Sequence, residues 1–389
     1  RERVMELSQR YGLSIDPDAL IEDITVGMQQ RVEILKMLYR DNQILIFDEP
    51  TAVLTPQEID ELMGIMRGLA AEGKSILFIT HKLAEIKAVA DRVTVLRKGA
   101  YVGTVQVADT SVEEMAEMMV GRKINFELDK QEVNPGKAAL SVRDLSVAGR
   151  HNKKAVDGVS FDVHQGEIVC IAGIDGNGQS ELVYALTGLM PLQSGQVLMN
   201  GEDITQYSIR RRNDLGMGHI PEDRHKYGLV LDYDLQQNLA LKDYHKPEMQ
   251  RHGFIRFDRV RAHAEDLISR FDIRSAQGPD TVSRSMSGGN QQKAIIAREI
   301  DIKPEVLIAV QPTRGLDVGA TMYIHEQLIK ERDSGKAVLL ISLELDEVFQ
   351  LADRILVIFE GRIVAEFAGK EATAQELGLY MAGSRKEKA

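Results

Sequence analysis

The sequence predicts an α/β fold, with mainly parallel sheets that occur in two related copies. Short apolar runs rich in β-branched residues alternate with stretches of helical periodicity, a pattern typical of strands that are buried on both faces of a sheet. The predicted strands lie at 44–47, 75–80, 93–96, 168–172, 306–310, 337–342 and 355–359. A glycine-rich turn joins the run at 168–172 to a helical stretch, which is the arrangement of a βα unit that binds phosphate.

The two copies are related by a constant shift of 262 residues, as from Gln29 to Gln291. The same shift pairs further identical residues without a gap: Pro50 with Pro312, Thr51 with Thr313, Gly73 with Gly335, Asp91 with Asp353, Arg92 with Arg354 and Gly99 with Gly361. An ungapped match over this distance indicates an internal duplication, and therefore two domains of one architecture.

We interpret residues 1–122 as the first unit, 123–138 as a polar linker and 139–389 as the second unit, which carries a charged helical subdomain at about 232–300. The second unit also has an upstream region, including Gly173, whose equivalent in the first unit would fall before residue 1. We therefore expect an incomplete first unit, with roughly 120 residues absent from the N-terminus of a longer natural protein. The first unit would then lack a central strand and expose apolar surface.

Composition restricts the class of protein. Hydrophobic residues make up 43% of the chain, yet no apolar run approaches the roughly 18–20 residues of a membrane helix. The one cysteine, Cys170, lies in the apolar run IVCIA and is predicted to belong to the core, so we expect no intrachain disulfide and a reducing cytoplasm. We expect no signal peptide or covalent membrane anchor, and the net charge of −11 argues against a nucleic-acid partner.

The segment GIDGNGQS follows the strand at 168–172 and opens a helix, so its glycines would let backbone N–H groups converge on phosphate oxygens. It matches the pattern Gly-x-x-x-x-Gly-Lys-Ser/Thr except at Gln179, where the missing lysine forfeits a charge-assisted bond of about 1.5–3 kcal/mol. A glycine-rich turn without a ligand remains the alternative for this segment alone. The predicted phosphate-loop residues are Gly173, Asp175, Gly176, Asn177, Gly178, Gln179 and Ser180.

A second motif, SGGNQQK at 287–293, is more specific. A serine and two glycines at the start of an amphipathic helix offer a hydroxyl group and unobstructed backbone donors to a phosphate. The residues concerned are Ser287, Gly288, Gly289, Asn290 and Gln291. Here the chain resembles the ABC ATPase family, whose signature motif has this form. The resemblance covers essentially the whole chain, including the Asp-Glu-Pro-Thr segment at 48–51, Thr80-His81 and the Asp-Arg-(apolar)-Gly pattern at 353–361.

Within that family the chain most resembles the double-cassette ATPases of bacterial simple-sugar and nucleoside importers, and the segments QPT and TVGMQQRVEI resemble the nucleoside branch. This resemblance implies tandem cassettes, each with a mainly parallel core sheet, an antiparallel β portion and a helical subdomain that carries the signature. It implies ATP and Mg²⁺ as cofactors and integral-membrane permease subunits as partners. It further implies indirect coupling to an extracytoplasmic substrate-binding protein, and a peripheral location on the cytoplasmic face of the bacterial cell membrane.

The resemblance also implies roles for single residues. Asp48 would orient the Mg²⁺ shell, Glu49 would polarise the attacking water, and His81 would contact the γ-phosphate or that water. Asp317 would belong to the loop that follows the Pro-Thr pair. Glu222 stands where many cassettes have a glutamine that links nucleotide to partner, so it would sense the site or contact a permease; simple solvation of its loop is the alternative.

The two units are chemically unequal at these positions. In the second unit, Val310, Gln311 and Leu343 replace the aspartate, the glutamate and the histidine, and cannot perform their tasks. The first unit has a weakened signature, made of Thr25, Val26, Gly27 and Met28, and it has Thr55 where the second unit has Asp317.

ABC cassettes pair head to tail, so each nucleotide lies between one phosphate loop and the opposite signature. One such site would combine the consensus residues Asp48, Glu49, His81, Ser287, Gly288, Gly289 and Asp317. The other site would combine the weakened positions of both units. Because the losses fall together at one site, we expect one hydrolytic and one degenerate site in an importer's energy-coupling subunit.

Two other functions stay open. A soluble double-cassette ATPase that acts on ribosomes usually keeps both sites and joins them by a long basic linker, whereas this linker is short and mixed in charge. A non-catalytic regulatory remnant would have no reason to keep Asp48, Glu49 and His81 together. Without a phosphate loop in its first unit, the chain as written is expected to hydrolyse little ATP alone.

Overall fold

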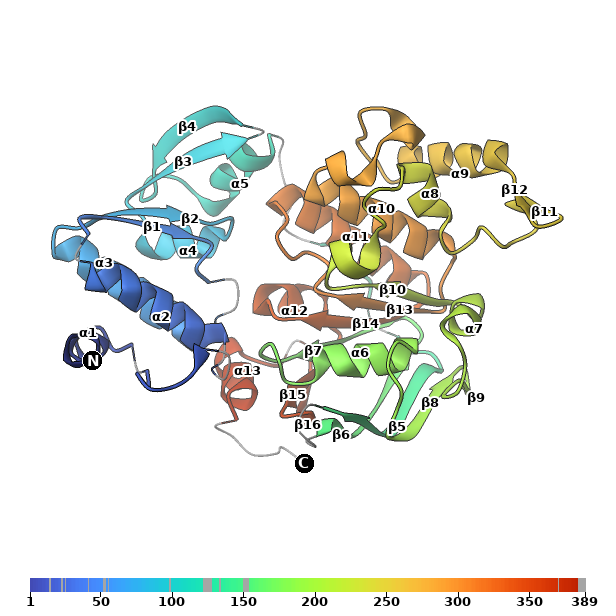
Figure 1. Ribbon diagram of the computed structural model, residues 1–389, viewed down its shortest axis with the longest axis horizontal. Coiled ribbons are helices and arrows are strands. Elements are labelled where there is room, and N and C mark those ends of the chain that lie inside the picture. Colours follow the sequence, from blue (N-terminus) through green and yellow to red (C-terminus); the bar gives the residue numbers. More distant parts are fainter. Residues whose placement is uncertain are drawn as a thin grey trace. The chain divides into compact units, whose positions relative to one another are not determined.

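A computed structural model describes residues 1–13, 15–21, 24, 26–40, 42–51, 54, 56–97, 99–121, 128–132, 134–149, 154–369 and 371–383. By its internal contacts the chain divides into two compact units, Arg1–Asn125 and Phe126–Ala389 (Figure 1). Over these described ranges, no helix combines the length and the apolar character that crossing a bilayer requires.

The second unit is built on a six-stranded sheet with the order β10-β13-β14-β7-β15-β16. The strands are β7 (Glu167–Ala172), β10 (Met217–Ile220), β13 (Val306–Val310), β14 (Ala337–Ser342), β15 (Arg354–Phe359) and β16 (Arg362–Ala368). All neighbouring strands are parallel except β15 and β16. Every residue of β7, β13 and β14 is buried, which confirms the strands predicted from continuous apolar runs.

Side chains of this sheet alternate between two hydrophobic clusters. On one side, Val169 and Ile171 pack with α6 (Gln179–Thr187) and with an antiparallel sheet. That sheet has the order β6-β5-β8-β9 and contains β5 (Ala138–Ala148), β6 (Lys154–His164), β8 (Ser194–Met199) and β9 (Glu202–Asp203). On the other side Cys170, fully buried as predicted, joins a cluster formed with the helices that follow in the chain.

The helices of the second unit after α6 are α7 (Ile209–Asp214), α8 (Leu235–Ala240), α9 (Phe257–Arg270), α10 (Gly288–Asp301), α11 (Val318–Asp333), α12 (Leu345–Leu351) and α13 (Ala374–Met381). Short helical turns lie at Arg224–Gly228, Gly278–Asp280 and Ser283–Ser285. The stretch predicted to be helical also contains a hairpin of β11 (Gln250–Arg251) and β12 (Phe254–Ile255), because His252 and Gly253 take the positive φ values of a two-residue turn.

The first unit repeats the second with the same shift of 262 residues. Its elements are α1 (Glu2–Arg10), α2 (Val26–Tyr39), β1 (Ile44–Asp48), α3 (Pro56–Ala71), β2 (Ser75–Ile79), α4 (Leu83–Val89), β3 (Arg92–Arg97), β4 (Ala100–Gln106) and α5 (Val112–Val120). From α2 onward, each has its counterpart between α10 and α13. The match extends to the backbone, since Glu49 and Gln311 both have φ of 44° and donate to the carbonyls of Ile79 and Ile341.

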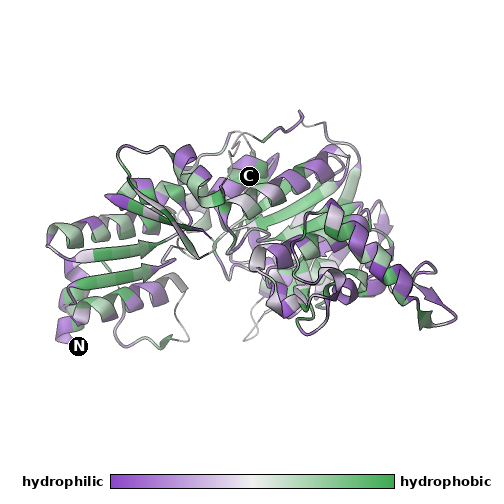
Figure 2. Cartoon of the chain, turned by 90° about the horizontal axis from the view of Figure 1, so that it is seen from above, coloured by the Kyte–Doolittle hydropathy of each residue, from purple (hydrophilic) through white to green (hydrophobic). Residues whose placement is uncertain are grey.

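The first unit exposes apolar side chains that the second unit buries. Its strands form two separate pairs, β1-β2 and β3-β4, whereas β7 lies between the corresponding strands of the second unit. The side chains of Ile44, Ile46, Leu77 and Ile79 are 48–68% exposed, and their counterparts Val306, Ile308, Leu339 and Ile341 have no exposed surface. These strands are the strongly apolar pair near the N-terminus in Figure 2. The described residues of the first unit include no counterpart of β5–β8 or α6, so the predicted exposure is confirmed.

His219 on β10 should make the second unit less stable in acid. Burial lowers the pKa of its imidazole from 6.5 to about 4, with Lys242 and Arg298 opposing protonation and Glu299 favouring it. The unfolded chain therefore takes up a proton as pH falls from 6.5 towards 4, while the folded unit does not. The unfolding free energy should fall by about 3 kcal/mol over this window. Guanidinium unfolding of wild type and His219→Asn should show a smaller loss in the variant; equal losses would contradict this assignment.

Candidate functional site

The carboxyl ends of β1 and β2 bring together the predicted catalytic residues of the first unit. These strands are parallel neighbours, so the residues that follow them meet at one edge of the sheet. His81 Nδ1 lies 3.0 Å from Glu49 Oε1, and both side chains are partly open to solvent. Asp48 is the exposed last residue of β1. The edge therefore offers a carboxylate paired with an imidazole, which can orient a water and accept its proton.

The second unit keeps this backbone but has none of this chemistry at the equivalent positions. Val310 is buried at the end of β13, and Gln311 and Leu343 are half-buried. The loop after β13 takes part in a buried polar network, in which Thr313 Oγ1 donates to Glu347 at 2.8 Å and His325 Nε2 lies 3.0 Å from the same carboxylate. This network fixes the loop after β13 without presenting a carboxylate at its surface.

The glycine-rich loop after β7 leads into α6 as predicted, and its backbone requires glycine. A Cβ on Gly178 would lie 2.2 Å from the carbonyl oxygen of Ala155, and one on Gly173 would lie 2.8 Å from that of Ile358. Asp175 and Gly176 form the exposed tip of the loop. The loop therefore presents backbone N–H groups and the first turn of α6, which together form a ready site for an anion.

Two amide side chains close this loop from within. Gln179 Nε2 donates to the carbonyl of Ile174 at 2.8 Å, and Asn177 Nδ2 donates to the same oxygen at 3.1 Å. Asn177 Oδ1 also accepts from the backbone N–H of Glu360 at 2.8 Å. The buried Gln179 therefore stabilises the loop, at the position where the phosphate-loop pattern has a charged lysine.

Gln179→Lys should strengthen nucleotide binding to this loop. An ammonium group at this position would add a charge-assisted bond to phosphate, so affinity should rise about tenfold or more. The loss of the amide bond to Ile174 reduces that gain. Titration of the 389-residue chain with a fluorescent ATP analogue would measure the change, with Gln179→Met as a control that removes the amide and adds no charge. An unchanged affinity would contradict a phosphate-binding role for the loop.

Glu222 occupies the other side of this loop. Its carboxylate accepts hydrogen bonds from Ser180 Oγ at 3.0 Å and from Tyr184 Oη at 3.1 Å. Burial, with added effects of Tyr227 and Glu222, raises the pKa of Tyr184, so its phenol stays protonated and donates. Ser180 is the residue that the phosphate-loop pattern assigns to Mg²⁺. A metal bound at Ser180 would therefore have Glu222 beside it, as a competing acceptor or a further oxygen ligand.

The signature motif forms the first turn of α10. Ser287 is the exposed residue that precedes this helix, and its Oγ accepts from Asn290 Nδ2 at 2.9 Å. Gly288 and Gly289 begin the helix without side chains, and both residues are half-buried. Gln291 is instead buried; its Nε2 donates to the carbonyl of Ser283 at 2.9 Å, so its side chain supports the preceding loop.

Two features around the signature follow only from the structure. A Cβ on Gly288 would lie 3.1 Å from Nη2 of Arg224, whose Nη1 donates to the carbonyl of Arg314 at 3.2 Å. Sequence reasoning missed Arg224, although it lies only two residues after Glu222 in the chain. Asp317 caps α11, where its carboxylate accepts from the N–H of Ala320 at 2.9 Å.

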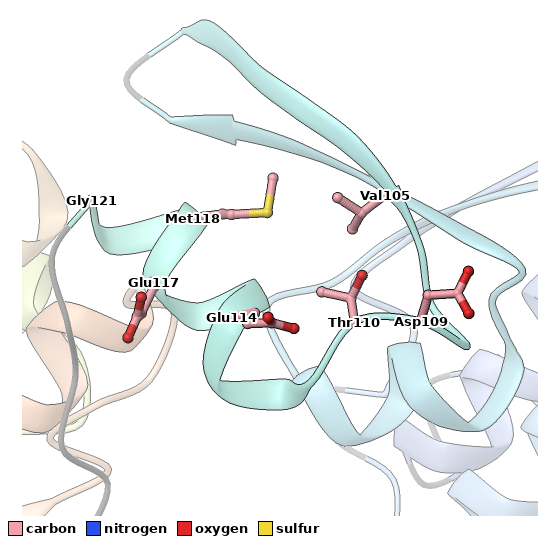
Figure 3. A pocket seen from close by; sticks show the side chains of 7 residues that line it. All are labelled: Val105, Asp109, Thr110, Glu114, Glu117, Met118 and Gly121. Carbon is pink, nitrogen blue, oxygen red and sulfur yellow. The ribbon is translucent and has the colours of Figure 1, made fainter.

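The structure gives less information on the positions of the first unit that were predicted to belong to the degenerate site. Thr25 and Thr55 lie outside the described residues. Val26 and Gly27 begin α2, and Met28 follows them with an exposed side chain. A surface pocket of about 580 Å³ lies elsewhere in the first unit (Figure 3) and is lined by Val105, Asp109, Thr110, Glu114, Glu117, Met118 and Gly121, none of which the sequence predicts to be functional.

Comparisons with known proteins agree with this architecture. The sequence profile described as ABC transporter matches residues 1–52 and 156–314. A crystal structure of a nucleotide-free ATP-binding cassette from an ABC transporter matches with a TM-score of 0.53 and 22% sequence identity, covering 63% of this chain and 96% of that chain. At this identity the likeness shows the fold alone.

Curated relatives match over nearly the whole chain. Nucleoside import ATP-binding protein NupA of Lactococcus lactis subsp. cremoris is 54% identical over 383 residues, which cover 98% of this chain and 76% of the relative. Guanosine import ATP-binding protein NupO of Bacillus subtilis is 52% identical over 390 residues, which cover 100% of this chain and 76% of the relative. With this identity across two duplicated cassettes, the chain belongs to the ABC transporter family, as one of its ATP-binding proteins.

Proposed function

We propose that this chain is the energy-coupling ATPase subunit of an importer for nucleosides, with simple sugars as the alternative cargo. The two curated relatives are named for nucleoside and guanosine import, which supports the substrate class. In this proposal, closure of the two cassettes on ATP drives permease subunits embedded in the membrane. An extracytoplasmic binding protein delivers the cargo to the permease, and this chain works at the cytoplasmic face.

The observation that carries the proposal is the contact between Glu49 and His81, 3.0 Å apart at the end of a parallel strand pair. The equivalent backbone in the second unit is the same, yet Gln311 and Leu343 stand there. A shared backbone with catalytic side chains on one side only is what one hydrolytic and one degenerate site require.

In the hydrolytic site Glu49 acts as general base towards the attacking water, which is worth about 10²–10⁴ in rate. His81 holds the Glu49 carboxylate through Nδ1 and leaves Nε2 for the γ-phosphate. Asp48 fits the outer shell of a hard cation, because its carboxylate is exposed at the end of β1. Bound Mg²⁺ would supply charge neutralisation on the phosphates.

The signature of the second cassette, Ser287, Gly288 and Gly289, would complete this site with Asp317. Residues 1–122 contain no phosphate-loop pattern to serve Glu49, so the 389-residue chain alone should turn over little ATP. The loop at 173–180 would instead serve the degenerate site, which binds nucleotide without a general base.

Reconstitution tests the proposal: the natural protein that carries this sequence is placed in proteoliposomes together with its permease. ATP-dependent accumulation of labelled guanosine is the expected result. If a labelled pentose accumulated and guanosine did not, the cargo would be a simple sugar instead of a nucleoside. Failure to assemble with any permease, together with sedimentation with ribosomes, would overturn the proposal in favour of a soluble ATPase.

A further inference from the structure

We propose that the β11-β12 hairpin and the start of α9 form a contact surface for an anionic lipid membrane. The hairpin surface consists of Arg251, His252, Phe254, Ile255, Arg256, Phe257 and Arg259. β11 and β12 pair only with each other in the described sheets, and in Figure 1 they project from the helices of the second unit. The inference rests on the proposed function only for the location of the protein at a membrane.

The hairpin surface is preformed by its backbone. His252 and Gly253 have φ of 51° and 84°, which suits the two-residue turn between Arg251 and Phe254. The N–H of Gly253 donates to Gln250 Oε1 at 2.9 Å, and the N–H of Arg256 donates to the carbonyl of Met249 at 2.9 Å. These bonds close the hairpin at its tip and at its base, so its side chains are held outward before any partner binds.

Its apolar side chains have little protein around them. Phe254 is 79% exposed, Phe257 67% and Ile255 44%, and Phe254 is the most exposed large apolar side chain among the described residues. Packing of α9 does not need them, because that helix is anchored through the buried Val260, Ala264 and Leu267. Two phenylalanines exposed together are costly in water and gain free energy when they enter an apolar phase.

The charge of the hairpin surface is opposite to that of the chain. The whole protein carries −11, yet the hairpin surface holds three arginines and the only acid within it in sequence is Asp258. That carboxylate is shared loosely, at 3.6 Å from Arg256 and 3.9 Å from Arg259. Arg251 is exposed and forms no ion pair with the described part of the chain. A locally positive surface lets an acidic protein approach an anionic membrane. Salt screens the protein's negative charges that lie farther than about 8–10 Å from the membrane, so they hardly oppose the contact.

The combination of these groups favours lipid over a protein partner. Arginines next to exposed aromatic side chains match the interface of a bilayer, where the rings enter the boundary of the acyl chains and the guanidiniums bind lipid phosphates. Arg251, Phe254 and Ile255 lie on strands of two residues each, and this narrow projecting hairpin can insert between headgroups but offers little area for a protein interface.

Flotation of the 389-residue chain with vesicles tests the proposal. Binding is expected with vesicles of phosphatidylglycerol and phosphatidylcholine, and it should be much weaker with phosphatidylcholine alone. The double variant Phe254→Ser with Phe257→Ser should lower the partition coefficient by about tenfold or more. Arg251→Gln should lower it by about fivefold and reduce its sensitivity to salt. The matched control is Tyr101→Ser, an exposed aromatic residue of the first unit, which should bind as the wild type does.

Equal binding to both kinds of vesicle, or unchanged binding by the double phenylalanine variant, would overturn the proposal. It would also be overturned if the wild type ignored vesicles while the double variant lost co-purification with a permease, since the surface would then bind protein. A fluorescent ATP analogue added to the same samples separates this failure from that of the proposed function. Retained nucleotide binding without vesicle binding would count against the lipid surface alone.

Discussion

Glu49→Gln is expected to lower ATP turnover at least about a hundredfold in the natural polypeptide that carries this sequence. The amide has the size of the carboxylate and can keep the contact with His81, 3.0 Å away in the wild type. It cannot accept the proton of the attacking water, so the chemical step fails while ATP is still bound. Phosphate release by the permease complex measures turnover, and retention of labelled ATP measures binding.

The same position in the second unit provides the control. Gln311→Glu places a carboxylate on a backbone with the same φ of 44°. It should not create a second hydrolytic site, because Val310 and Leu343 still replace the aspartate and the histidine. Normal turnover by Glu49→Gln would contradict the assignment of the hydrolytic site, and rescue of that variant by Gln311→Glu would contradict the asymmetry.

The sequence predicted the core strands because their apolar runs are long and the duplication repeats them. Period and composition identified β7, β13 and β14, which are buried at every residue. They also led to the expectation that the first unit would expose part of its sheet. The shift of 262 residues places the counterpart of β7 before residue 1, so β1 and β2 lack that neighbouring strand and the elements that follow it. Burial of a strand on both faces depends on elements from distant parts of the chain. Here the internal repeat showed from the sequence which of these elements the first unit lacks.

Other features depend on local backbone and on distant contacts. The hairpin at 250–255 lies inside a charged stretch that was predicted to be helical, and the sequence pattern gave no signal for the turn at His252-Gly253. Gln291 belongs to the signature by sequence, yet its amide is buried against the carbonyl of Ser283. Arg224 lies beside Gly288 although 64 positions separate them in the sequence, and no sequence pattern predicts a spatial contact between these two residues. Motifs therefore predicted which residues belong to the candidate site, while the direction of each side chain depends on contacts between distant segments of the chain.

Gly289→Asp should strongly lower hydrolysis without weakening the fold, which separates function from stability in the signature. A Cβ at Gly289 would lie 3.4 Å from that of Ala320, at the short end of ordinary van der Waals contact, so the backbone accepts a Cβ there. Gly289 is in the first turn of α10, where a carboxylate is favoured by about 0.3–1 kcal/mol. The unfolding free energy of the 389-residue chain should therefore be unchanged or slightly higher, as measured by guanidinium titration.

The same carboxylate would face the triphosphate that the signature is proposed to contact. Like charges at close range repel strongly where water is excluded, so turnover in the permease complex should fall about a hundredfold or more. Gly27→Asp is the matched control, because the shift of 262 residues pairs Gly27 with Gly289. It changes the weakened signature, which we propose serves the degenerate site, and should leave most of the turnover intact. If both substitutions lowered turnover equally, hydrolysis would depend on both signatures, and the division into one active and one degenerate site would be wrong.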